Sequence, residues 1–340
     1  MRTETPRRPR TVLAMDPPVR AALFDEAALA RLVALAETDP ALVVRDFADP
    51  AAAGALAGAE ALFTGWGCPP LTAAALDRMP RLRTVVHAAG SVKDHITDAC
   101  WARGLTVATA AAANALPVAE YTVAAVLFAG KRVAAARHAY RERRGRLDTL
   151  ALLAGAGNHR GTVGVVGASR IGRRVIELLR PYDLRLLLHD PYVSGAEARR
   201  LGVRPVDLAT LARSSEVVTL HAPGLPETRH LFDRELLALL PDGATLVNTA
   251  RGCLVDTGAL TAELVAGRLS AVLDVTEPEV LPAGSPLYDL PNVLLTPHIA
   301  GSLGNELPRL AQAALDELER YARGLPYADP VRPGRLHRSA

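Results

Sequence analysis

Residues 162–180 read TVGVVGASRIGRRVIELLR, and this stretch decides the fold. Four of its first five residues are β-branched, and from Arg170 onward the apolar residues recur at helical spacing. A strand, a glycine turn and a helix in direct succession open the doubly wound α/β domains in which a helix N-terminus holds a phosphate. The stretch therefore predicts a dinucleotide-binding turn, made of Gly167, Ser169, Arg170, Ile171 and Gly172.

The usual glycine pattern of such a turn is incomplete in this sequence. Gly167 stands where the first glycine makes the tight turn, and Gly172 where the third lets the helix pack closely on the strand. Ser169 occupies the middle position, where glycine normally lets the pyrophosphate approach the backbone. Because the two flanking glycines are present, we interpret the serine as tolerable.

The second strand of the same unit, LRLLLHD, is predicted at 184–190 and ends at Asp190. This aspartate lies 18 positions after Gly172 (190 − 172 = 18). A carboxylate at this place can accept a hydrogen bond from the ribose 2′ hydroxyl and would repel a 2′-phosphate, which favours NAD over NADP. The alternative is an ordinary α/β domain with a solvent-facing aspartate.

Short apolar runs alternate with helical stretches on both sides of the glycine turn. One series spans about residues 11–108, and a second begins at the turn and continues to about residue 297. A chain of 340 residues has room for two domains, and the alternation predicts two doubly wound parallel sheets. Between the series lies a long helical pattern at 116–143, with Pro117 expected in its first turn and Gly130 inside it.

Composition excludes several classes of protein. The net charge is +3, and basic residues are mixed with acidic ones, so no nucleic-acid partner is expected. Residues 1–10 contain four arginines and are expected to form a disordered tail. The apolar run 118–130 is too short for a membrane span and contains Glu120, which predicts a buried helix. The cysteines, Cys68, Cys100 and Cys253, are far apart and lack metal-ligand spacing, which predicts no metal site and a reducing cytoplasm.

Three later strands are each followed by a polar cluster. Arg251 follows one predicted strand, Glu277 and Glu279 follow the next, and His298 follows the last. The carboxyl ends of parallel strands are where ligands bind in open α/β sheets. Arginine binds a carboxylate in two-pronged fashion, histidine donates a proton, and a neighbouring carboxylate favours the protonated imidazole. These groups together predict reduction of a 2-oxo acid.

From about Thr84 to Arg309 the chain resembles the D-isomer-specific 2-hydroxyacid dehydrogenases. The resemblance is strongest in VVTLHAPGLPETRHLF (217–232), LVNTARGCLVDTGAL (246–260) and LPNVLLTPHIAG (290–301). It implies that Arg251 binds substrate, that His298 is the acid/base and that Glu279 pairs with it. The family glutamate lies five residues after the strand-end aspartate, here Asp274, which selects Glu279 over Glu277, although Val280 stands where the family has proline.

The resemblance also implies that two domains of the chain bind different ligands. Residues 1–114 and 305–340 would form a flavodoxin-like substrate-binding domain, and residues 115–304 a Rossmann NAD-binding domain that pairs into a homodimer. In the first, the turn Ala89, Gly90 and Ser91 would bind the substrate carboxylate, with Trp66 near the mouth of the cleft and His87 worth testing. Further cofactor contacts are expected from His221, Ala222, Thr228, Thr249, Ala250 and Asp274.

Two other functions remain open at this stage. The same architecture serves in corepressor-like proteins that sense NAD(H) without significant turnover, because a fold does not fix a function. A relative of formate dehydrogenase is a further possibility, although its extended N-terminal region and its asparagine-rich substrate loop are not evident in this sequence.

Overall fold

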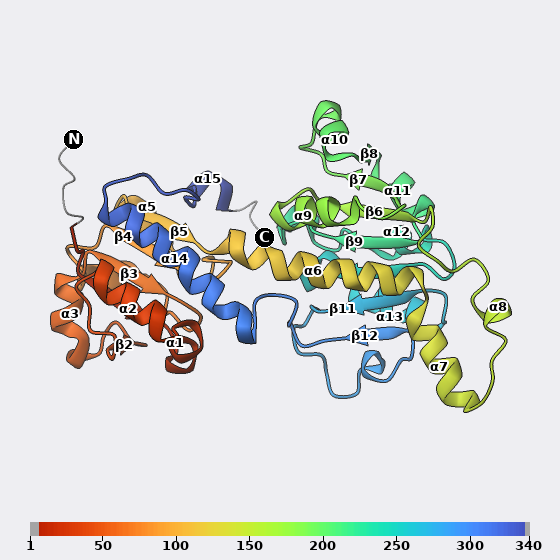
Figure 1. Cartoon of the computed structure of the whole chain (residues 1–340), viewed down its shortest axis with the longest axis horizontal. Coiled ribbons are helices and arrows are strands. Elements are labelled where there is room, and N and C mark those ends of the chain that lie inside the picture. Colours follow the sequence, from red (N-terminus) through yellow and green to blue (C-terminus); the bar gives the residue numbers. More distant parts are fainter. Residues whose placement is uncertain (1–6, 337–340) are drawn as a thin grey trace. The chain divides into compact units, whose positions relative to one another are not determined.

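The computed structural model describes residues 7–336. Contacts between Cα atoms divide these residues into two compact units, one made of residues 7–115 and 302–336 and the other of residues 116–301. Each unit is built on one sheet of parallel strands, as the alternating pattern predicts (Figure 1). We call them the first unit and the second unit.

The first unit contains five parallel strands in the order β2-β1-β3-β4-β5. They are β1 (Thr11–Ala14), β2 (Val43–Val44), β3 (Ala61–Thr64), β4 (Thr84–His87) and β5 (Thr106–Thr109). This is the flavodoxin-like order, and two apolar cores cover the two faces of the sheet. The helices are α1 (Pro17–Leu23), α2 (Glu26–Leu35), α3 (Ala53–Gly58), α4 (Ala73–Asp77), α5 (Asp98–Ala102), α14 (Leu307–Ala322) and α15 (Pro333–Leu336).

The second unit contains seven parallel strands in the order β12-β11-β10-β9-β6-β7-β8. They are β6 (Thr162–Val166), β7 (Arg185–His189), β8 (Arg204–Pro205), β9 (Val217–Leu220), β10 (Thr245–Asn248), β11 (Ser270–Leu273) and β12 (Val293–Leu295). The sequence patterns did not predict β8, which has two exposed residues and so carries no apolar signal. The helices are α7 (Val133–Arg143), α8 (Thr149–Leu152), α9 (Arg170–Leu179), α10 (Gly195–Leu201), α11 (Leu208–Ser214), α12 (Arg234–Ala238) and α13 (Thr257–Val265).

The helix α6 (Ala111–Gly130) begins in the first unit and continues in the second. It starts earlier than expected, so Pro117 lies inside it rather than in its first turn, and Gly130 is its last residue. Ala119 and Val126 belong to the apolar core of the second unit. By length and composition alone, α6 is long and apolar enough to cross a membrane, a test that buried core helices also meet.

Helix α7 has no buried residue, and the same holds for α8, the next helix along the chain. Arg137, Arg141 and Arg143 all lie on α7.

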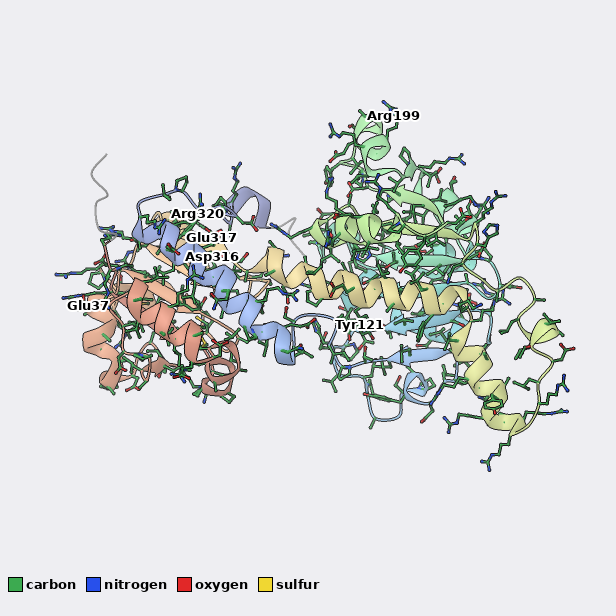
Figure 2. All side chains as sticks on the ribbon, in the orientation of Figure 1. Glu37, Tyr121, Arg199, Asp316, Glu317 and Arg320 are labelled. Carbon is green, nitrogen blue, oxygen red and sulfur yellow. The ribbon has the colours of Figure 1, made fainter. Side chains whose placement is uncertain are left out.

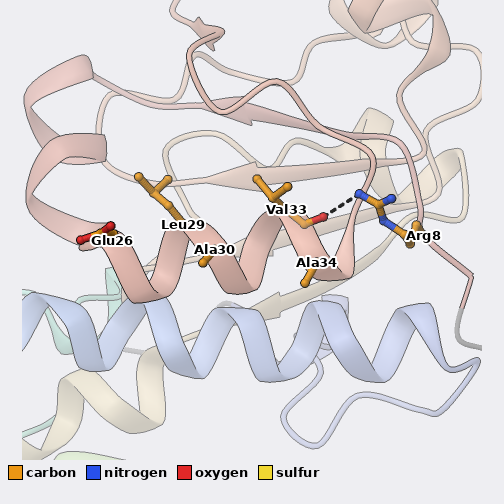
Figure 3. A pocket seen from close by; sticks show the side chains of 6 residues that line it. All are labelled: Arg8, Glu26, Leu29, Ala30, Val33 and Ala34. Carbon is orange, nitrogen blue, oxygen red and sulfur yellow. Dashed lines mark hydrogen bonds between the residues drawn. The ribbon is translucent and has the colours of Figure 1, made fainter.

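The expectation of a disordered tail is wrong for residues 7–10, while residues 1–6 lie outside the described residues. The Arg8 guanidinium donates hydrogen bonds to the Val33 carbonyl at 2.6 Å and to the Ala36 carbonyl at 2.9 Å, at the end of α2. Arg7 forms an ion pair with Glu60 at 2.9 Å. Arg8 and one face of α2 line a shallow apolar pocket (Figure 3), to which none of the predicted site residues contributes.

Candidate active site

The glycine turn after β6 requires glycine at two positions. Gly167 has a φ of +93°, and a Cβ atom there would lie 2.7 Å from the Ala222 backbone nitrogen. A Cβ atom on Gly172 would lie 2.1 Å from the Gly167 carbonyl oxygen. Real Cβ contacts are essentially never this short, so the two flanking glycines are fixed by sterics.

Ser169 occupies the N-cap of α9. Its φ of −61° is one that any residue adopts, and its hydroxyl accepts a hydrogen bond from the Gly172 N–H at 3.3 Å. The serine thus satisfies one of the free N–H groups at the helix start, which is the ordinary work of an N-cap residue. The substitution therefore leaves the turn intact and gives the serine a local structural role.

Asp190 and Arg173 hold the same turn from two sides. One oxygen of the Asp190 carboxylate accepts from the Ala168 N–H at 2.6 Å, and the other accepts from the Tyr192 N–H at 2.8 Å. Arg173 donates to the Ala168 carbonyl at 2.8 Å and pairs with Glu197 at 2.7 Å. The sequence analysis identified Asp190 but missed Arg173, whose position within α9 gave no signal.

Other predicted cofactor residues follow neighbouring strands of the same sheet. His221 and Ala222 follow β9, Thr249 and Ala250 follow β10, and Asp274 follows β11. Because these parallel strands are neighbours of β6 or of one another, their carboxyl ends share one edge of the sheet. The sheet therefore brings these residues to the edge that carries the glycine turn.

Two of these residues make contacts that shape the edge itself. His221 is fully buried and bonded to the Thr219 hydroxyl at 3.0 Å, and burial lowers its pKa to about 3, so the ring is neutral. Thr249 and Thr122 on α6 are joined by a 2.8 Å hydrogen bond. Thr228 lies in the short helix Pro226–Thr228, where its hydroxyl bonds the Pro223 carbonyl at 2.6 Å and fixes its own loop.

His298 and Glu279 are in direct contact. Nδ1 of His298 donates to a carboxylate oxygen of Glu279 at 2.6 Å, and both side chains are more than half exposed. Glu277 is engaged elsewhere, because it pairs with Arg229 at 2.7 Å and lies 3.4 Å from Nε2 of His230. The geometry thus separates the two glutamates in the way the family spacing implied.

Asp274 holds the turn that carries His298. The buried carboxylate accepts from the Ile299 N–H and the Ala300 N–H, both at 2.8 Å, and from the Thr296 hydroxyl at 2.6 Å. Tyr121 of α6, labelled in Figure 2, bonds Thr296 at 2.9 Å. His298 itself has a φ of +57°, a conformation that a non-glycine residue keeps only when its surroundings impose it. The sequence analysis assigned Asp274 to the cofactor and missed this role.

Arg251 lies three residues beyond β10, which is the strand next to β11. Its backbone carbonyl accepts from the Asn248 side chain at 2.9 Å, and its guanidinium is half-buried beside the Ala250 carbonyl. The following residue, Gly252, has no room for a side chain, because a Cβ atom would lie 2.0 Å from the Thr276 carbonyl oxygen. The loops that carry Arg251 and Glu279 are therefore packed backbone against backbone.

The predicted substrate turn, Ala89–Ser91, follows β4 in the first unit. The Ala89 carbonyl accepts from the Ala110 N–H at 3.1 Å, and the Ser91 hydroxyl accepts from the Lys93 N–H at 3.4 Å. Gly90 lies against the side chain of Asn114, whose carbonyl oxygen also accepts from the Ser302 N–H at 3.0 Å. The sequence analysis gave Asn114 no role.

Two further expectations concern a side chain and a metal. Trp66 follows β3 and is 42% exposed. Within residues 7–336, no group of three or more His, Cys, Asp or Glu side chains is arranged to hold a metal ion.

The candidate site is built from the glycine turn, the Arg251 loop and the His298–Glu279 pair.

Comparison with known proteins identifies relatives of the whole arrangement. A D-3-phosphoglycerate dehydrogenase from Archaeoglobus fulgidus is 33% identical over 249 residues, which cover 73% of this chain and 47% of that protein. A glyoxylate reductase from Aeropyrum pernix is 35% identical over 257 residues, which cover 73% of this chain and 76% of that protein. The chain spans about half the length of the phosphoglycerate dehydrogenases it matches.

A solved structure and a family description agree with these relatives. The TT0316 protein from Thermus thermophilus has a TM-score of 0.75 and 31% identity, with 95% of this chain and 100% of that chain covered. Residues 123–300 match the family described as "D-isomer specific 2-hydroxyacid dehydrogenase, NAD binding domain", a range that falls within the second unit. The chain therefore belongs to the D-isomer specific 2-hydroxyacid dehydrogenase family, and its second unit carries the NAD-binding domain.

Proposed function

We propose that this protein is an NAD-dependent oxidoreductase that acts on a CH–OH group and transfers a hydride between NAD(H) and a small 2-hydroxy or 2-oxo acid. The observation that carries the proposal is the 2.6 Å contact between His298 and Glu279 at the sheet edge that also holds Arg251. A histidine that can exchange a proton and an arginine that can bind a carboxylate are the two groups this reaction needs.

The residues of the second unit fit a dinucleotide. The Gly167–Gly172 turn leads into the start of α9, where the backbone N–H groups and the helix dipole favour an anionic pyrophosphate. Asp190 is placed beside that turn and would accept from a ribose hydroxyl. His221, Ala222, Thr228, Thr249, Ala250 and Asp274 are proposed to surround the remainder, alongside Ser169, Arg170 and Ile171.

The chain's own residues then act as follows. Because Glu279 binds Nδ1 of His298, the ring is oriented and Nε2 is the nitrogen free to exchange a proton with the substrate oxygen. Arg251 binds the substrate carboxylate and polarises the adjacent carbonyl. Asp274 keeps the His298 turn in its left-handed conformation. NADH, when bound, supplies the hydride.

We further propose that the first unit binds the substrate, through the backbone N–H groups of Ala89, Gly90 and Ser91. The turn lies at the carboxyl end of β4, the edge at which open parallel sheets bind ligands. Gly90 and Ser91 in this turn are half-buried and so remain partly exposed to solvent. The proposed partner is a small-molecule acid, without nucleic acid or membrane.

Turnover separates this proposal from its main alternative. NADH oxidation would be followed through the loss of NADH absorbance with glyoxylate, pyruvate, hydroxypyruvate, and bulkier and phosphorylated 2-oxo acids. We expect turnover with at least one of them. Tight NADH binding without turnover of any of them would contradict the proposal and favour a corepressor-like protein that senses NAD(H).

We also propose a homodimer that pairs through the second unit. Helix α7 has no buried residue, and its Tyr140 is 65% exposed. Phe128 on the preceding helix α6 and Leu150 on the following helix α8 are 62% and 88% exposed. Large exposed apolar side chains on consecutive helices are typical of an interface. Light scattering should give twice the mass of one chain, and Leu150→Asp should reduce that mass; a monomeric wild type would contradict the proposal.

The cellular location is proposed to be the cytoplasm. Cys68, Cys100 and Cys253 are all free thiols, which suits a reducing compartment. Fractionation of cells that express the full chain would test this proposal, and recovery outside the soluble cytoplasmic fraction would contradict it.

A further inference from the structure

Three polar side chains form a buried cluster in the first unit, which we call the histidine cluster. Its members are Thr64 at the end of β3, His87 at the end of β4, and His95; their exposed fractions are 0%, 2% and 3%. The Thr64 hydroxyl lies 2.9 Å from Nδ1 of His87 and 3.5 Å from Nε2 of His95. The two imidazole rings are 4.5 Å apart between centroids.

The cluster borders the proposed substrate turn. His87 is the residue from which the turn leaves β4, and the next N–H, that of Ala88, donates to the Thr64 carbonyl at 2.8 Å. The Ala110 N–H donates to the carbonyls of both His87 and Ala89, at 2.9 Å and 3.1 Å. The conformation of the turn is therefore tied to the residues that carry the cluster.

Both rings are held in the neutral form. Burial, with a smaller contribution from His95, lowers the pKa of His87 well below its ordinary value, and the Ser91 backbone acts in the opposite direction. Burial also lowers the pKa of His95 to about 4, opposed by Asp94. A neutral imidazole has one donor and one acceptor nitrogen, so each ring takes part in hydrogen bonding in one defined sense.

One proton arrangement uses the polar atoms of the whole cluster. Nε2–H of His95 points to the Thr64 hydroxyl, and that hydroxyl donates to Nδ1 of His87. Nε2 of His87 is then the N–H donor of that ring. This nitrogen is buried and has no hydrogen-bond partner within residues 7–336.

An apolar side chain would fill the same space without the cost of burying imidazole nitrogens. Buried polar side chains that bond one another instead fix the relative positions of the segments that carry them. The Ala88 N–H bonds the Thr64 carbonyl, and the Ala110 N–H bonds the carbonyls of His87 and Ala89, so the segment whose position the cluster fixes is the start of the turn.

We propose that Thr64, His87 and His95 are positioning residues that aim the N–H groups of Ala89, Gly90 and Ser91 at the substrate carboxylate. This inference rests on the function proposed above. The three side chains are buried and act through the turn, without touching the substrate.

The test compares two replacements of His87 with a matched control. His87→Leu removes both ring nitrogens at similar volume, and His87→Gln restores a donor and an acceptor. Tyr327→Phe is the control, because Tyr327 is partly buried in the same unit and bonds Thr84 at the opposite end of β4. His87→Leu and Tyr327→Phe each remove a polar group from the first unit, but only His87 lies beside the turn.

The steady-state constants for the best 2-oxo acid and the dissociation constant of NADH would be measured for each variant. His87→Leu should raise KM about tenfold, because the loss of one hydrogen bond to a charged group weakens binding by about that factor. The kcat and the dissociation constant of NADH should stay within about twofold of wild type. His87→Gln should recover most of this loss. A KM for His87→Leu no higher than that of Tyr327→Phe would overturn the proposal.

Hydrogen–deuterium exchange of the unliganded protein tests the conformation of the turn without relying on enzyme activity. A peptide spanning residues 88–92 should exchange faster in His87→Leu than in wild type or Tyr327→Phe. Unchanged exchange overturns the positioning role even if the enzyme is active. Faster exchange in His87→Leu, combined with a wild type that turns over no 2-oxo acid, would instead support the positioning role and refute the proposed function.

Discussion

Each unit has a turn at the carboxyl end of a parallel strand that we propose to bind a ligand, and the two turns are held in different ways. The turn after β6 is fixed by charged groups, with Asp190 and Arg173 on its two sides. The turn after β4 borders neutral groups, because His87 and His95 are buried and uncharged. The turn after β6 is thus held by charged groups that are partly exposed to solvent, whereas the turn after β4 borders polar groups that are buried and neutral.

This difference indicates which disturbance each turn can withstand. Asp190 and Arg173 are half-buried, which leaves them able to contact a cofactor. The histidine cluster keeps its geometry only while its rings are neutral, because a charged imidazole at that depth is strongly disfavoured. The nucleotide turn should thus be sensitive to steric change and the substrate turn to acid.

The largest effect is expected at a position that touches neither turn. His298→Asn removes the proton donor, and kcat should fall about 10²- to 10⁴-fold while the dissociation constant of NADH stays unchanged. Rapid-mixing kinetics and NADH fluorescence would measure the two quantities. A matched pair of carboxylates serves as control: Glu279→Gln should lower kcat, whereas Glu277→Gln, which faces Arg229, should not. Equal losses for both glutamates would show that the pairing is misassigned.

A steric change should damage the nucleotide turn next most strongly. In Gly172→Ala the added methyl group would lie 2.1 Å from the Gly167 carbonyl oxygen, so the turn must open. Overpacking of this kind costs about 1–3 kcal/mol, and we expect NADH to bind roughly tenfold more weakly. Gly54→Ala is the control, because nothing lies within 4 Å of its added methyl group. Isothermal titration with NADH measures both, and a Gly172→Ala protein that binds like wild type would disprove the steric explanation.

Acid should lower the stability of the first unit more than that of the second. The folded-state pKa values of His87 and His95 are lowered, so their contribution to stability is complete above the unfolded value near 6.5 and is lost as the pH falls toward 4. The first unit has these two buried histidines, whereas the second has His221. Between pH 6.5 and 5 each histidine should lower the free energy of unfolding by about 2 kcal/mol, so the first unit should lose more stability. Both tryptophans, Trp66 and Trp101, belong to the first unit, and their fluorescence in urea reports on it alone.

The double variant His87→Gln, His95→Gln gives the control for this pH effect. Glutamine does not titrate, so the midpoint in urea should change much less between pH 7 and pH 5. A wild type whose tryptophan-reported midpoint is the same at both pH values would show that the two rings are not buried in the neutral form.

The smallest effect is expected from Ser169→Gly, which restores the usual glycine pattern. The change removes the N-cap hydroxyl that bonds the Gly172 N–H. Glycine at an N-cap costs only a few tenths of a kcal/mol relative to serine, so the dissociation constant of NADH should change less than about threefold. Titration of NADH into both proteins measures it, and a tenfold tightening would mean that the serine crowds the pyrophosphate.

Much of the fold was predictable because parallel strands that are buried on both faces leave a strong signal. Runs such as 162–166 and 217–220 are mainly apolar, and each is a buried strand. The early start of α6 and the strand β8 were missed, since the first begins in an alanine-rich stretch without a cap signal and the second is exposed. The ordered residues 7–10 were missed because arginine side chains bind carbonyls of α2 that are distant in sequence.

The sequence by itself determined the parts of the candidate site that depend on residue type and order: glycines where a side chain cannot fit, and Arg251, Glu279 and His298 after successive strands. Tertiary structure alone decided which side chains support them. Asp274 beneath the His298 turn, Arg173 beside Ala168, and His87 against Thr64 and His95 come from segments separated along the chain or from helix positions without a pattern. Hydrogen bonds between distant segments depend on three-dimensional packing, and packing is what a linear pattern does not contain.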